Sequence, residues 1–278
     1  MVSNNQRLII RISKGTLSFS VVDPTALNGI LYQPCIVKSG ISMAANLREV
    51  IRDGETLSTL GVTMAANTRP RATVMVEASV LMVPLDDFRE EDCETLYRHT
   101  FTRQSDFSSA ATEDTILHTV IPEFSAVAVF GMNKDLKLVL DDHFTDLRIM
   151  PLTLPVWTHL YQRHFSGARQ KLFAYFHDKK MEVFLFGQRR LKYVNTFSVG
   201  HAHDALYFLL YAWRQLGLNA EGDELHLVGD TTHGDWLFQR LRLYLKKVYQ
   251  IQPSAEFNNA PITRMKDFPY DLMVLLNQ

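Results

Sequence analysis

The segment VGDTTHGD, at residues 228–235, places an aspartate and a histidine at the end of an apolar run, where metal ligands often gather. Asp230 and His233 are three positions apart, one more than the Asp-x-His spacing typical of binuclear metal sites. Such a site takes several further His or Asp ligands from later loops, and no histidine follows His233 in the sequence. We therefore interpret the segment as a strand-to-helix loop in which Thr232 or another small polar residue caps the helix.

A second polar segment, GHAHDAL at residues 200–206, brings His201, His203 and Asp204 close together. An HxHxD set can begin a metal site, but no neighbouring segment supplies the additional ligands. Asp204 falls in the first turn of a predicted helix, where a carboxylate interacts favourably with the helix N-terminus. The two histidines stay secondary ligand candidates, and we carry His201 forward as a candidate binding residue.

Lysines stand in two short turns. The stretch SKGT places Lys14 next to Gly15, and the stretch HDKK places Lys179 next to Lys180. An ammonium group attracts a phosphate or a carboxylate without the help of a metal. The alternative is that these lysines only keep exposed turns hydrated. We retain all four residues as candidates for ligand binding.

Composition and charge exclude several classes of protein. The 278 residues are 46% hydrophobic, which is usual for a globular chain. The formal net charge of -1 gives no overall attraction to nucleic acid or anionic lipid, so we expect neither as a partner. The basic stretch RLRLYLKK, at residues 240–247, is interpreted as the solvated face of a helix. Because no apolar run approaches the roughly 18 residues of a membrane helix and no secretory signal is recognisable, we expect a cytoplasmic protein without membrane insertion.

Common catalytic motifs are missing from the sequence. There is no P-loop, no GxSxG and no GxGxxG pattern. Cys35 and Cys93 stand far apart without a CxxC pair, which argues against a zinc site and against a disulfide framework. We therefore name no catalytic residue, no metal ligand and no cofactor from these patterns.

The elements that position these residues occur in one order, twice. Residues 7–22 predict two strands joined by a tight turn, and residues 29–37 predict a third strand. Residues 41–53 have apolar side chains at helical spacing, and Asp53-Gly54 ends that helix. The stretch RATVMVE, at residues 71–77, predicts a fourth strand.

The second copy begins at residue 171. Residues 171–187 predict a hairpin and residues 191–197 a third strand. Residues 202–217 predict a helix, and ELHLV at residues 224–228 a fourth strand. A second helix is predicted from 234 to about 249, because Leu237, Leu241, Leu245 and Val248 recur at helical spacing.

The strands of the second hairpin predict a sheet that is buried on both faces. Residues 173–176 and 183–186 are apolar at successive positions, whereas a sheet with one wet face would alternate apolar and polar residues. We therefore expect an α/β protein with two lobes, each a mixed sheet covered by helices, and a cleft between them.

We place the first lobe at residues 1–165 and the second at residues 166–278. The first lobe is expected to carry an insertion at about 84–150. That insertion reads as a charged run before a short helix, a polar loop at 105–115, and a hairpin turning at Asn133-Lys134.

The duplicated order of three strands, a helix and a strand resembles the actin-like ATPase superfamily, a ribonuclease H-like fold that includes sugar kinases, Hsp70 and actin. The stretch SVGHAHDALYFLLYAWRQLGL, at residues 198–218, is similar to the strand, loop and helix of bacterial cell-division and pilus-assembly relatives. The stretch LHLVGDTTHGDWLFQRL, at residues 225–241, resembles their adenosine-binding strand, with Gly229 in place. The chain also resembles an uncharacterised bacterial family of actin-like proteins in which these loops are degenerate.

The resemblance implies a nucleotide site that this sequence lacks in part. Active members open each hairpin with an Asp that holds a magnesium-bound water and, two residues on, a Gly that lets backbone N–H groups approach phosphate. Here Arg11 and Ser13 stand at those places in the first hairpin, and Tyr175 and His177 in the second. Asp230 replaces the second Gly of the adenosine motif. We therefore do not expect metal-dependent ATP hydrolysis by the usual route.

Two functions follow as expectations. The first is a non-catalytic binding or scaffold protein that contacts a protein partner through the cleft or the insertion, with homo-oligomerisation left open. The alternative is a nucleotide-binding ATPase or kinase with an altered phosphate site, in which Lys14, Lys179 or Asp230 replace missing groups. The candidate ligand-binding residues of the cleft are Lys14, Gly15, Lys179, Lys180, His201, Gly229 and Asp230.

Overall fold

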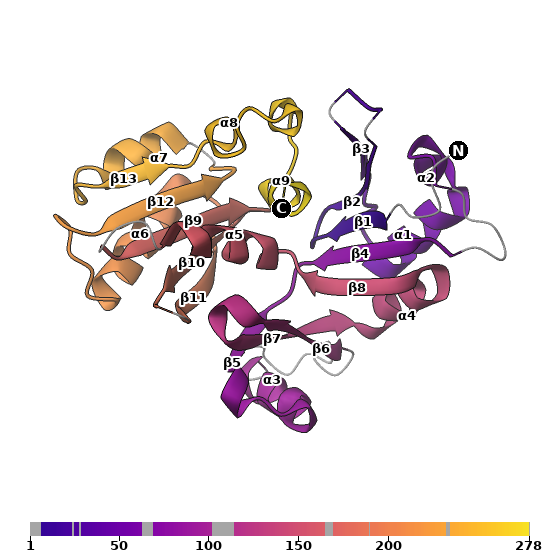
Figure 1. The fold of residues 1–278 in the computed structure, drawn as a ribbon, viewed down its shortest axis with the longest axis horizontal. Coiled ribbons are helices and arrows are strands. Elements are labelled where there is room, and N and C mark those ends of the chain that lie inside the picture. The colour runs from indigo at the N-terminus through magenta and orange to yellow at the C-terminus, as the bar shows by residue number, and fades with distance from the viewer. Residues whose placement is uncertain are drawn as a thin grey trace. The chain divides into compact units, whose positions relative to one another are not determined.

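The computed structural model describes residues 7–23, 25–27, 29–62, 69–101, 114–164, 169–188, 190–231 and 234–277. The chain divides into two compact units, Met1–Leu154 and Pro155–Gln278 (Figure 1). The division falls at the start of α5 (Leu154–His164), whereas the sequence placed the boundary after residue 165. Each unit is therefore described by itself.

The first unit contains a five-stranded mixed sheet. In sheet order its strands are β3 (Ile30–Cys35), β2 (Leu17–Val22), β1 (Arg7–Ile12), β4 (Arg71–Val76) and β8 (Thr145–Pro151). The first three strands pair antiparallel, and β1, β4 and β8 pair parallel. The four strands predicted from the sequence in this half are confirmed.

Helices cover one face of this sheet with a single apolar core. They are α1 (Met43–Asp53), α2 (Glu55–Thr59) and α4 (Lys134–His143). Ser42 caps α1 by accepting a hydrogen bond from the Ala45 N–H at 3.2 Å. The predicted end at Gly54 is also confirmed, because this glycine has the left-handed φ of 71° that closes a helix.

A smaller sheet belongs to the same unit. Its order is β5 (Val80–Pro84), β7 (Ala126–Asn133) and β6 (Asp114–Ile121), and α3 (Cys93–Phe101) packs on it. Short 3-10 turns accompany it at Leu85–Asp87, Glu90–Asp92 and Pro122–Phe124. The insertion expected at about 84–150 thus overlaps this sheet, while α4 and β8 from the same range join the larger one. Most of the polar loop expected at 105–115 lies outside the described residues.

The hairpin predicted at Asn133-Lys134 is wrong. Strand β7 ends at Asn133, whose side chain accepts a hydrogen bond from the Leu136 N–H at 3.1 Å and so caps α4. Leu136, Val139 and Leu140 then face the core at helical spacing. The sequence suggested a turn at Asn133, but Asn is as favourable at the start of a helix as in a turn.

The second unit repeats the architecture. In sheet order its strands are β11 (Leu191–Ser198), β10 (Lys180–Phe186), β9 (Lys171–His177), β12 (Glu224–Gly229) and β13 (Val248–Gln250). The helices are α5, α6 (Ala202–Gln215), α7 (Gly234–Leu241), α8 (Pro253–Glu256) and α9 (Tyr270–Leu276), with a 3-10 turn at Pro261–Arg264. The predicted repeat of three strands, a helix and a strand is confirmed.

Strands β9 and β10 of the second sheet are buried on both faces, as their apolar side chains predicted. Alternate side chains of β9 and β10 enter one core with α6 and α7. The other side chains meet α5 and α9: the Phe186 ring lies 5.3 Å from the Tyr161 ring, and the Tyr175 hydroxyl donates to Asp271 Oδ2 at 2.8 Å.

The helix predicted from 234 to about 249 is too long. It ends at Leu241, and after a turn Val248–Gln250 forms β13, which pairs parallel with β12. Leu245 and Val248 are buried in the core with α7, as their spacing suggested. The apolar period was real, but pairing with the edge of β12 satisfies the backbone of β13. Its expected cap, Thr232, lies outside the described residues.

Candidate functional site

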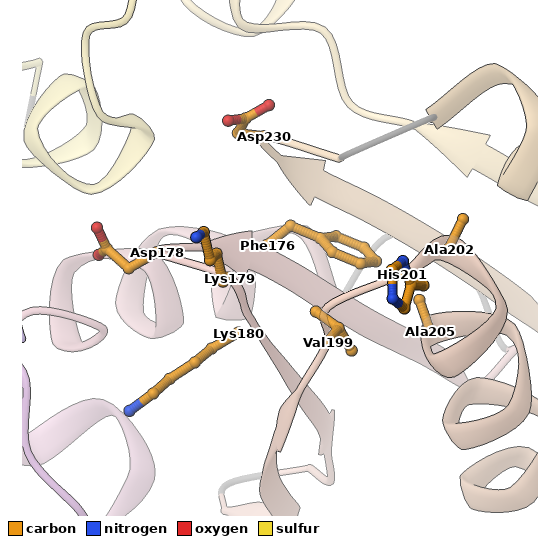
Figure 2. A pocket seen from close by; sticks show the side chains of 9 residues that line it. All are labelled: Phe176, Asp178, Lys179, Lys180, Val199, His201, Ala202, Ala205 and Asp230. Atoms are coloured by element: carbon orange, nitrogen blue, oxygen red, sulfur yellow. The ribbon is translucent and has the colours of Figure 1, made fainter. Parts of the chain in front are cut away.

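The second unit contains a pocket of about 320 Å³ at one end of its sheet (Figure 2). The β9–β10 turn, the start of α6 and the end of β12 form its walls. Polar side chains in the lining are Asp178, Lys179, Lys180, His201 and Asp230, and apolar side chains are Phe176, Val199, Ala202 and Ala205. Four of the residues predicted from the sequence therefore meet here, although they lie more than 50 positions apart at the extremes.

The β9–β10 turn places its polar residues at the pocket. His177 pairs with Lys180, so the turn consists of Asp178 and Lys179, with φ of 44° and 60°. Two successive positive φ values define the tight hairpin turn that follows the twist of the strands. Neither residue is a glycine, so both carry side chains in a conformation that L-residues rarely adopt. In Figure 2 the Lys180 amine points away from the other labelled side chains.

Gly229 has a structural reason to be glycine. Its φ is 86°, and a Cβ atom there would lie 2.3 Å from the carbonyl oxygen of Phe176. The close approach lets the Asp230 N–H donate to the same carbonyl at 3.1 Å. Gly229 thus fixes where Asp230 leaves the sheet. The Asp230 side chain is exposed and has no hydrogen-bond or ion-pair partner within the described part of the chain.

His201 and His203 are separated at the start of α6. The His201 N–H donates to Asp204 Oδ2 at 2.9 Å, so the predicted role of Asp204 at the helix N-terminus is confirmed. The His203 ring instead lies 4.4 Å from the Trp236 ring of α7. Among residues that the structure places, no group of three His, Cys, Asp or Glu side chains could hold a metal ion.

Lys14 and Gly15 form the equivalent turn of the first unit. The Ser13 N–H donates to the Thr16 carbonyl at 2.9 Å and closes that turn. The Thr16 hydroxyl lies 2.7 Å from the Ser13 hydroxyl and accepts from the Arg11 guanidinium at 3.0 Å. The polar side chains of this hairpin therefore hydrogen-bond to one another.

Two equivalent acids, Glu77 and Asp230, follow the fourth strands in the two sheets, β4 and β12. The Glu77 N–H donates to the Ile12 carbonyl just as the Asp230 N–H donates to that of Phe176. Glu77 Oε2 also accepts from the Lys14 N–H at 2.7 Å. In the first unit, the Glu77 carboxylate thus accepts from the turn N–H that could otherwise bind an anion. In the second unit, the Asp230 carboxylate lines the pocket instead.

The other face of the second sheet holds a buried polar group that the sequence did not single out. Tyr175 and His177 are buried with their rings stacked 4.7 Å apart, and His177 Nε2 has no hydrogen-bond partner among the residues that the structure places. Glu182 accepts from Trp157 Nε1 at 2.9 Å. Burial raises the pKa of the Glu182 carboxyl to about 7, although His177 opposes the shift. In the sequence, Glu182 could have been recognised only as a single charged residue within an apolar strand.

Solved structures define the class. A protein of actin-like ATPase fold and unknown function from Bacteroides thetaiotaomicron VPI-5482 matches with a TM-score of 0.77 and 24% identity, over 99% of this chain and 97% of that one. A chain of the PilM-PilN type IV pilus biogenesis complex matches with a TM-score of 0.54 and 12% identity, over 98% of this chain and 96% of that one. The protein therefore has the actin-like ATPase fold, as the repeated order of strands predicted.

The sequence then gives the family. Residues 2–248 match the family described as protein of unknown function DUF3822, and the chain belongs to it. No curated protein matched the sequence. Within the described ranges, no helix is both long and apolar enough to cross a membrane.

Proposed function

We propose that this protein is a non-catalytic binding or scaffold protein that has kept the actin-like fold without its metal-dependent phosphate chemistry. The observation that carries the proposal is the residues of the two hairpins. Where the resemblance implies an Asp for the magnesium-bound water, the first hairpin has Arg11 on β1 and the second has Tyr175 on β9. A guanidinium or a phenol cannot replace the hard anionic oxygen that Mg²⁺ requires.

The contacts of these residues support the proposal. Arg11 is 4% exposed and donates to Thr16 within its own hairpin, and the Lys14 N–H is held by Glu77. Tyr175 is 1% exposed and is fixed by its hydrogen bond to Asp271. Neither side chain is available to a ligand without breaking a buried hydrogen bond, which costs about 1–3 kcal/mol.

A protein partner is the occupant we favour for the scaffold. A chain in the PilM-PilN complex shares this fold over nearly its whole length, and that complex is an assembly of proteins. The proposal for this chain is that its own surface also serves binding to another protein inside the cytoplasm.

One observation favours a second candidate, a nucleotide-binding ATPase or kinase with an altered phosphate site. Lys179 and Lys180 line the pocket of the second unit together with Asp230, which follows Gly229 in the stretch that resembles the adenosine motif.

A panel of nucleotides separates the two functions. We expect millimolar ATP, ADP and GTP, with and without magnesium, to leave the melting temperature unchanged and no phosphate to be released. A nucleotide at 100 times its Kd would add about 2.7 kcal/mol of stability, a shift that a melting curve resolves easily. Magnesium-dependent turnover that Lys179→Gln or Asp230→Asn abolishes would establish the second candidate and end the first.

A further inference from the structure

The pocket of the second unit has two chemically different ends. The lining includes the charged side chains of Lys179 and Asp230, which Figure 2 shows away from the His201 end. At the other end the lining is apolar or carries the His201 ring, and the apolar side chains are Phe176, Val199, Ala202 and Ala205. The pocket therefore suits a ligand with a charged head and an apolar body.

The charged end carries both signs. Asp230 supplies a carboxylate and the exposed Lys179 supplies an ammonium group within the same lining, while the Asp178 carboxylate already lies 3.3 Å from His177 Nδ1. A purely anionic head would meet the Asp230 carboxylate, and a purely cationic head would meet the lysine. A head that has both charges can pair with each sign at once, and such charge-assisted hydrogen bonds are stronger than neutral ones.

Asp230 is the group that a cationic ligand would reach first. Its equivalent Glu77 is occupied by the Lys14 N–H, whereas the Asp230 carboxylate has no partner among the residues described. Phe176, whose backbone carbonyl accepts from the Asp230 N–H, is 4% exposed and its ring points toward the His201 end of the pocket (Figure 2). The hydrogen bond from the Asp230 N–H to the Phe176 carbonyl thus fixes the backbones of both residues relative to each other.

We propose that this pocket binds a small zwitterion with an aliphatic side chain, the chemistry of a free apolar α-amino acid. Its ammonium group pairs with Asp230, its carboxylate pairs with Lys179, and its side chain lies against Phe176 and Val199. The volume of about 320 Å³ is at the lower limit of the ~300–1,000 Å³ usual for ligand pockets, which fits a ligand of this size. The inference rests on the proposed function as a binding protein, because it requires that the pocket serves binding rather than phosphate transfer.

Four probes test the charge requirement by titration calorimetry on the full chain. They are L-leucine, 4-methylpentanoate, 3-methylbutylamine and the dipeptide leucyl-leucine. We expect L-leucine to bind, and the two analogues that lack one charge to bind about tenfold more weakly or not at all. The dipeptide separates a free amino acid from a longer peptide, and we expect it to bind more weakly because it exceeds the pocket.

Variants of Asp230 and Lys179 test whether these two residues bind the ligand. Asp230→Asn is expected to weaken L-leucine about tenfold while 4-methylpentanoate, freed from repulsion by the carboxylate, binds no more weakly than before, and Lys179→Gln is expected to weaken both. Lys192→Gln, an exposed position on β11 outside the pocket, is the matched control and should bind as the parent does.

The inference is overturned if L-leucine fails to bind, if 4-methylpentanoate binds as tightly as L-leucine, or if Asp230→Asn has no effect. These outcomes leave the proposed function intact as long as ATP neither binds nor turns over. Magnesium-dependent ATP turnover would instead remove the proposed function and this inference together.

Discussion

At the scale of single residues, the most unusual group is the carboxyl of Glu182. It lies within a buried strand, where Trp157 Nε1 donates to it and His177 stands nearby. Desolvation disfavours the charged form, so the neutral acid is favoured in the folded protein. The free energy of unfolding should therefore depend on pH through this one residue.

We expect the contribution of Glu182 to be complete below the pKa of 4.5 in the unfolded chain and to be lost as the pH rises to about 7. The loss amounts to about 3 kcal/mol, because each unit of pKa shift corresponds to ~1.4 kcal/mol. Denaturant unfolding at pH 5 and pH 8 should show this decline in the parent and a smaller one in Glu182→Gln. Glu221→Gln, at an exposed residue, is the control; an equal decline in both variants would contradict the assignment.

Gly229 supports a second prediction at this scale. Gly229→Ala should destabilise by at least about 2 kcal/mol, because its Cβ would meet the Phe176 carbonyl and its φ is left-handed. Gly15→Ala, in the turn between β1 and β2, is the control, because no atom lies within 4 Å of its added Cβ. Urea unfolding measures both. Equal stability of the two variants would show that Gly229 is not required by packing.

At the scale of elements, the turn of the β9–β10 hairpin carries backbone strain that lowers the stability of the hairpin. Asp178 and Lys179 both hold positive φ angles without the freedom of glycine. Asn-Gly at these two positions would form the same turn with less backbone strain. Stability alone therefore does not explain the lysine at the tip of the turn.

Lys179→Gly should therefore raise stability by roughly 0.5 kcal/mol, since relief of the left-handed strain exceeds the entropy lost by a more flexible unfolded chain. Lys180→Gly, one residue later and within β10, should lower stability by about 0.5–1 kcal/mol. The midpoints of thermal unfolding compare the two. A loss of stability in both variants would contradict the strain.

At the scale of the whole molecule, the order of elements was predictable, and the ends of several elements were not. The repeat showed because tight turns, β-rich runs and an amphipathic helix recur in the same succession. The segment after Asn133 and the segment after Leu241 were predicted wrongly, because a cap and a sheet edge compete with local periodicity there. Those choices depend on contacts that no short stretch of sequence contains.

The candidate site was predictable only in part for the same reason. Lys179, His201 and Asp230 were identified by residue type and by the fold that the chain resembles, and the structure brings them to one pocket. Phe176 and Val199, which give the pocket its apolar floor, look like any other core residues in the sequence. The hydrogen bond from the Lys14 N–H to Glu77 was invisible, because it joins residues 63 positions apart.

The acids that follow β4 and β12 differ by a single methylene group. With its longer side chain, Glu77 reaches its own hairpin and accepts from the Lys14 N–H, at the place that a bound anion would take. The shorter Asp230 has no side-chain partner among the residues described. The length of one side chain thus distinguishes the two copies of the fold, and Asp230→Glu would be the smallest change that makes the two halves alike.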